Sequence, residues 1–136
     1  MTSTPRARAT LAAVAALALA AGLVTVARAA SVLDFDVWMR SIDKHSVEVQ
    51  KNIEARKPEA AVADAQELSR LYALMQTYFV DDGHAADAVA FSRSGKALAD
   101  AIAPAIAAKD YDTAAKAALD LSHACNDCHD VHKPFQ

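Results

Sequence analysis

The sequence predicts an all-α protein, an up-down-up-down antiparallel four-helix bundle. Alanine is abundant, and beyond residue 30 glycine occurs only at positions 83 and 95. No run of alternating β-branched residues indicates a strand. Helix stop signals divide this part of the chain into four segments of similar length with short links, and such segments pack most simply as antiparallel neighbours.

The first predicted helix covers residues 34–56, with Asp34 or Asp36 as its N-cap. It must end before Pro58, because the residue that precedes a proline disfavours the α-helical region. Pro58 in turn suits the first turn of a helix. The second predicted helix therefore covers residues 58–80.

The third predicted helix covers residues 85–108 and contains Pro104, which is expected to kink it. The fourth begins at Asp110 or Asp112, since either carboxylate can accept hydrogen bonds from the first backbone N–H groups of a helix. It is predicted to end near Lys133. No internal repeat interrupts these segments.

Each predicted helix carries apolar residues at a spacing of three and four, the pattern of a face that packs into a core. The fourth stripe leads towards Cys125 and His129. The predicted core residues, helix by helix, are Phe35, Trp38, Ile42, Val49 and Ile53; Val62, Ala65, Leu68, Leu71, Tyr72, Met75 and Phe79; Val89, Phe91, Leu98, Ile102 and Ile106; and Ala115, Ala118, Leu119 and Ser122.

Residues 1–29 are predicted to be a cleaved secretory signal peptide. Two arginines precede an uncharged stretch, residues 9–27, and Ala27-Arg28-Ala29 offers a cleavage site of small residues. A retained membrane anchor is the alternative, although the high alanine content makes the stretch weakly apolar. Cleavage would leave residues 30–136 as one domain in the periplasm, without a stable membrane span.

The most specific motif is Cys125-Asn126-Asp127-Cys128-His129, which reads C-x-x-C-H. This is the pattern of c-type haem attachment. Two thiols three residues apart can form thioether bonds to the two vinyl groups of a haem, and the adjacent imidazole can bind the iron. The chain has no other cysteine.

Three other interpretations of the motif stay open. A thiol redox site is one, but it usually accompanies a βαβ pattern, which this sequence lacks. A zinc site is another, with Cys125, Cys128, His129, His132 and the nearby His123 as candidate ligands. A simple disulfide in an oxidising compartment is the third.

With this motif at the end of a helical chain, the sequence resembles a class II cytochrome c, the cytochrome c-prime family. Members of that family are exported four-helix bundles with C-x-x-C-H near the end of the last helix. The family motif commonly continues with an aromatic residue and an arginine, where this chain has His132 and Lys133. The resemblance implies one haem c bound covalently by Cys125 and Cys128, with His129 as the proximal iron ligand. It also implies a possible homodimer.

The residue on the distal side of the iron decides the function. Helix register places position 40 of the first helix level with His129, and Met39 falls there. The family's distal residue often follows a first-helix arginine by four positions; from Arg40 this gives Lys44, next to His45. Met39 and His45 both flank the apolar stripe, so Met39 is the tentative distal ligand and His45 the alternative. An open site is the third possibility.

We therefore expect an exported monohaem cytochrome that transfers electrons and is not an enzyme. Axial ligation by His129 with Met39 or His45 would make it low-spin. A five-coordinate haem protein that binds nitric oxide or carbon monoxide is one alternative, and an exported helical protein stabilised by zinc or a disulfide is another. Removal of the signal peptide takes away three arginines and no acid, so the net charge falls from −3 to −6; this acidic balance argues against nucleic acid as a partner and is compatible with a basic redox partner protein.

Overall fold

The computed structural model describes residues 29–83 and 85–132, which form four α-helices packed against one another, with no strand in these ranges. The helices are α1 (Val32–Glu54), α2 (Pro58–Asp82), α3 (Ala86–Ala107) and α4 (Tyr111–Val131). The predicted all-α class is confirmed, and each predicted boundary lies within about two residues of the observed one. Apart from Ala29, the predicted signal peptide lies outside the described residues.

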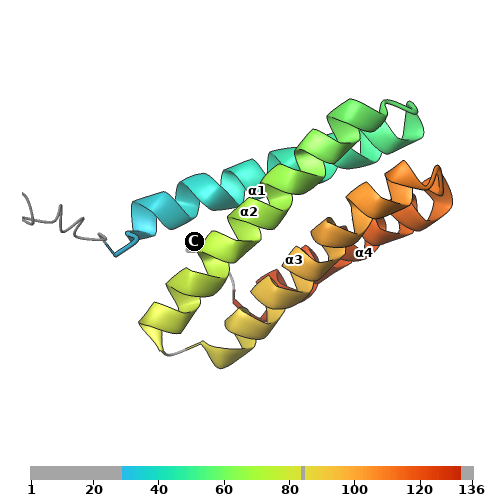
Figure 1. Ribbon diagram of the computed structural model, residues 1–136. Coiled ribbons are helices and arrows are strands. Elements are labelled where there is room, and N and C mark those ends of the chain that lie inside the picture. The colour runs from blue at the N-terminus through green and yellow to red at the C-terminus, as the bar shows by residue number, and fades with distance from the viewer. Residues whose placement is uncertain (1–28, 84, 133–136) are drawn as a thin grey trace, which may run out of the picture.

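The helices alternate in direction, and each packs against two others (Figure 1). The α2–α3 interface is the most extensive and the α1–α4 interface the least extensive. Figure 1 shows α1 diverging from α2 towards its first turn. There Phe35 stacks on Tyr78, with 4.9 Å between ring centroids, and meets Phe79 edge-on.

Local signals account for the helix ends, with one correction to the prediction. The N-cap of α1 is Ser31, not Asp34 or Asp36. Ser31 Oγ accepts a hydrogen bond from the Asp34 backbone N–H, and the Asp34 carboxylate accepts one from the Ser31 N–H, so Asp34 completes a capping box instead of starting the helix. Gly83 ends α2 with a left-handed φ of 71°, the backbone conformation that favours glycine.

Local signals also account for the link between α3 and α4. Asp110 caps α4 by accepting a hydrogen bond from the Thr113 N–H at 3.0 Å. Lys109 turns the chain between α3 and α4 with a positive φ of 59°. Pro104 lies inside α3, and the helix continues through it to Ala107.

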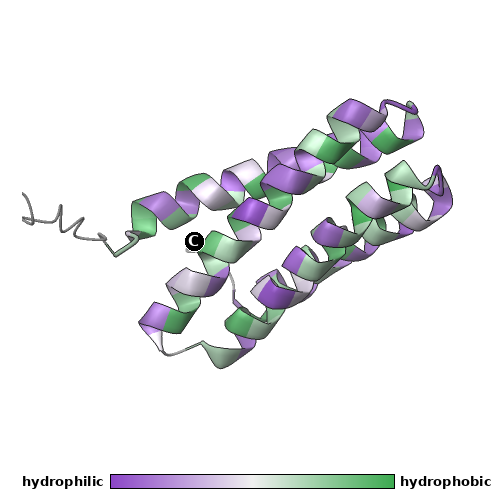
Figure 2. Cartoon of the chain, in the orientation of Figure 1, coloured by the Kyte–Doolittle hydropathy of each residue, from purple (hydrophilic) through white to green (hydrophobic). Residues whose placement is uncertain are grey.

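The core runs along the inner faces of all four helices, and its largest fully buried side chains include Ile42, Leu68 and Ile102. Figure 2 shows that every helix alternates between polar and apolar residues. None of the helices in the described ranges has the length and apolarity needed to cross a membrane.

The predicted stripe of α4 is wrong at two positions. Ala115 is exposed, and Leu119 is 48% exposed. The buried face is instead formed by Ala114, Ala117, Ala118 and Leu121. Alanine lies on both faces of this helix, so the sequence offers little contrast, and a choice shifted by one residue rotates the predicted stripe by about 100°.

Leu121 and Leu119 form a matched pair that tests this rotation. Leu121 is fully buried, so Leu121→Ala should lower the free energy of unfolding by about 2–5 kcal/mol. Leu119→Ala, two residues away on the exposed face, should change it by less than about 0.5 kcal/mol. Denaturant unfolding measures both, and equal losses would contradict the observed orientation of α4.

Candidate functional site

The C-x-x-C-H motif lies in the last turns of α4 and opens on a pocket between the helices. Cys125, Cys128 and His129 all line this pocket. Their spacing of three and four residues places them on one face of the helix. That face continues the buried stripe of α4 from Leu121, so the packing of the helix directs the motif inwards.

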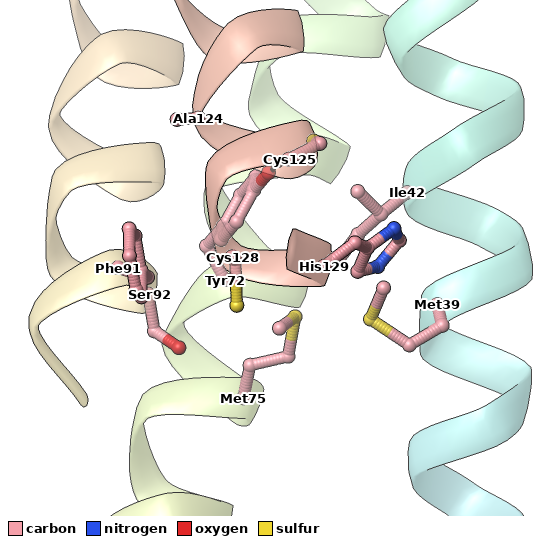
Figure 3. A pocket seen from close by; sticks show the side chains of 10 residues that line it. All are labelled: Met39, Ile42, Tyr72, Met75, Phe91, Ser92, Ala124, Cys125, Cys128 and His129. Carbon is pink, nitrogen blue, oxygen red and sulfur yellow. Dashed lines mark hydrogen bonds between the residues drawn. The ribbon is translucent and has the colours of Figure 1, made fainter. Parts of the chain in front are cut away.

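Met39 of α1 lines the same pocket as His129. Figure 3 shows the His129 ring directed from α4 towards α1, with the Met39 side chain beside it. Met39 is partly buried and packs against the core. The structure therefore brings together the four predicted site residues Cys125, Cys128, His129 and Met39.

His45, the alternative distal candidate, is not brought to this pocket. Its Nδ1 lies 2.7 Å from Oδ1 of Asp64 on α2. The other carboxylate oxygen of Asp64 accepts a hydrogen bond from Asn52 at 2.8 Å. The His45 side chain is 22% exposed. It is held on the side of α1 that faces α2, where it links the two helices.

The remaining lining of the pocket is mostly apolar. Ile42, Met75 and Phe91 contribute hydrocarbon or thioether surface, and the hydroxyl of Ser92 is satisfied by the Ala88 carbonyl. The pocket is partly open, and its volume is about 20 Å³, little more than the roughly 10–15 Å³ that one water molecule needs. A larger group enters only if side chains turn aside, and methionine, with three rotatable bonds, adapts most readily.

Both motif thiols are unpaired, and their surroundings keep them neutral. Burial raises the pKa of the Cys125 thiol above its ordinary value. Burial also raises the pKa of Cys128, and the negative charge of Asp87 adds to the effect. Since the thiolate is the reactive form, both side chains are poor nucleophiles at neutral pH.

The sequence analysis missed one contact of the motif. The hydroxyl oxygen of Tyr72 lies 3.1 Å from Cys125 Sγ. Burial raises the pKa of Tyr72 well above its usual range, so its phenol stays protonated and can donate. Tyr72 was predicted only as a core residue, because helical spacing identifies the buried face of α2 but not its partner on another helix.

The candidate zinc ligands do not gather around one point. In the ranges that the structure describes, no three side chains of His, Cys, Asp and Glu are close enough to hold a metal ion together. His123 is exposed, and the His132 Nε2 lies 2.8 Å from an Asp87 carboxylate oxygen. The His132–Asp87 contact links the end of α4 to the start of α3.

Comparisons of this chain with protein-family models, with curated proteins and with solved structures found no match. The resemblance to the cytochrome c-prime family therefore depends on the motif at residues 125–129 and on the helical pattern of the chain.

The His132–Asp87 contact predicts a measurable titration. Its hydrogen bond holds the pKa of Asp87 below the ordinary aspartate value. A lowered folded-state pKa stabilises the fold above the ordinary aspartate pKa, and this contribution is lost as the pH falls through the lowered value. His132→Phe should therefore raise the pKa of Asp87 in an NMR titration of the carboxyl carbons.

Asp110 provides the control for this titration. Its pKa is also lowered, but by hydrogen bonds from Thr113, so His132→Phe should leave it unchanged. A pKa of Asp87 that stays low in the variant would show that His132 is not its cause.

Proposed function

We propose that this chain is an exported monohaem c-type cytochrome that transfers electrons, a divergent relative of the cytochrome c-prime family. One observation carries the proposal. Two thiols, one imidazole and one thioether, from Cys125, Cys128, His129 and Met39, line a single, mostly apolar pocket inside a four-helix bundle.

The residues of the pocket fit a haem in their chemistry. Cys125 and Cys128 would hold it through thioether bonds, and His129 would bind its iron. The apolar side chains of Ile42 and Phe91 suit the faces of a porphyrin. The pocket must widen to accept the group, and the α1–α4 interface, the least extensive of the bundle, borders it.

The haem would supply one-electron redox chemistry, and the chain would tune it. The imidazole of His129 and the thioether of Met39 would both bind the iron, and methionine ligation raises the reduction potential. Apolar walls exclude water and penalise the additional positive charge of the oxidised state, which acts in the same direction.

The polypeptide would act on no substrate and would exchange electrons with another protein. A basic redox partner suits the acidic net charge of the chain. The periplasm is the proposed location, because the predicted signal peptide directs export and c-type haem is attached outside the cytoplasm.

Mass spectrometry of the exported chain tests the attachment. The chain, produced with haem-maturation machinery, should gain the mass of one haem and become coloured. Replacing both Cys125 and Cys128 with Ser should abolish the gain, because no thioether bond can then form. A colourless parent chain without added mass would contradict the proposal and would favour the exported helical protein without haem.

The visible spectrum tests the distal ligand. The parent protein should be low-spin, and Met39→Ala should make it high-spin and let the reduced form bind carbon monoxide rapidly, because the iron would lose one protein ligand. Met75→Ala removes the other methionine of the pocket, and His45→Ala removes the alternative distal candidate; neither should change the spin state.

Each contrary result has a definite meaning. A parent spectrum that is already high-spin and five-coordinate would favour the alternative function, binding of nitric oxide or carbon monoxide. A change with His45→Ala but none with Met39→Ala would transfer the distal role to His45.

A further inference from the structure

Tyr72 is a core residue whose hydroxyl contacts the C-x-x-C-H motif. Its side chain comes from α2, is only 5% exposed, and points its hydroxyl at Cys125 Sγ on α4, 3.1 Å away. A buried tyrosine hydroxyl generally needs a hydrogen-bond partner. Among the described residues, the hydrogen-bond partner of the Tyr72 hydroxyl is Cys125 Sγ. Figure 3 shows the two side chains meeting at the edge of the pocket.

Gly95 of α3 makes this position possible. A Cβ atom at residue 95 would lie 2.4 Å from Cε1 of Tyr72 and 2.6 Å from its Cζ. Such distances are far inside van der Waals contact. Glycine weakens the interior of a helix, so a buried glycine in the middle of α3 indicates a packing requirement. The requirement here is room for the Tyr72 ring.

A chain of contacts across three helices thus ends at the Cys125 sulfur. The ring of Tyr72 is seated against Gly95, and its hydroxyl reaches one sulfur of the motif and not the other. Cys128 has no corresponding hydroxyl contact among the described residues. The two cysteines of the motif therefore have different surroundings, although their spacing makes them look equivalent.

We propose that Tyr72 is a positioning residue for the Cys125 sulfur and, through it, for one edge of the haem. This inference rests on the proposed function. A thiol can donate or accept a hydrogen bond, whereas a thioether has no S–H and can only accept. Once Cys125 is attached, the Tyr72 hydroxyl is therefore the donor, and it withdraws electron density from a sulfur bonded to the porphyrin side chain.

The test compares two tyrosines that each lose only a hydroxyl. Tyr72→Phe keeps the ring against Gly95 and removes the donor, so the reduction potential of the haem-bearing protein should fall. Tyr78→Phe removes a hydroxyl from the ring stacked on Phe35, which does not line the pocket, and should leave the potential unchanged. A merely structural role of Tyr72 would change the unfolding midpoint without changing the potential.

A second variant tests the packing of the Tyr72 ring against Gly95. Gly95→Ala should displace the Tyr72 ring and also lower the potential. Combining it with Tyr72→Phe should add little further change, because both act through one contact. If Tyr72→Phe leaves the reduction potential unchanged, the proposal is overturned, even if the Gly95→Ala protein fails to fold.

Thiol reactivity separates this inference from the proposed function. If the chain carries no haem, both cysteines are free to react, and Tyr72→Phe should slow the alkylation of Cys125 several-fold, since the hydroxyl no longer stabilises the thiolate. Alkylation of Cys128 should be unaffected. That result would reject the cytochrome while keeping the Tyr72–Cys125 contact, and equal rates in parent and variant would reject the contact itself.

Discussion

The rotation of α4 about its own axis is the constraint on which both the core and the candidate site depend. The buried residues Ala114, Ala118 and Leu121 lie on the same face as Cys125 and Cys128. Small side chains let this helix approach its neighbours closely, and the fully buried Leu121 fixes the face that turns inwards. A rotation by one residue would expose Leu121 and turn the thiols away from α1 and α2. The packing that stabilises the bundle therefore also directs Cys125, Cys128 and His129 into the pocket.

The helices could be predicted from the sequence because their ends carry strong local signals. Pro58 begins α2 and Gly83 ends it, and the links between the helices are short. The N-cap of α1 was predicted wrongly because Asp34 is a good cap by type, and only the geometry shows that it serves Ser31 as the third helical residue. The stripe of α4 was displaced because alanines on both faces hide the boundary between inside and outside.

The part of the candidate site that lies within one stretch of sequence could be predicted. The contacts that it makes with other helices could not. The spacing of residues 125–129 sets one face of one helix, which sequence periodicity describes well. Met39 and His45 flank the stripe of α1 on opposite sides, so periodicity could not separate them. The partner across the interface separates them: Asp64 of α2 engages His45, whereas Met39 faces the pocket. Tyr72 lies 53 positions from Cys125, and no local pattern reports such a pair.

The close packing of the Tyr72 ring against Gly95 limits which substitutions the sequence can accept. The ring of Tyr72 occupies the volume that any larger residue at position 95 would need. Substitutions at the two positions, which lie on different helices, are therefore coupled. Alanine at position 95 would require a smaller or displaced side chain at position 72. The effect of a substitution at either position therefore depends on the residue at the other.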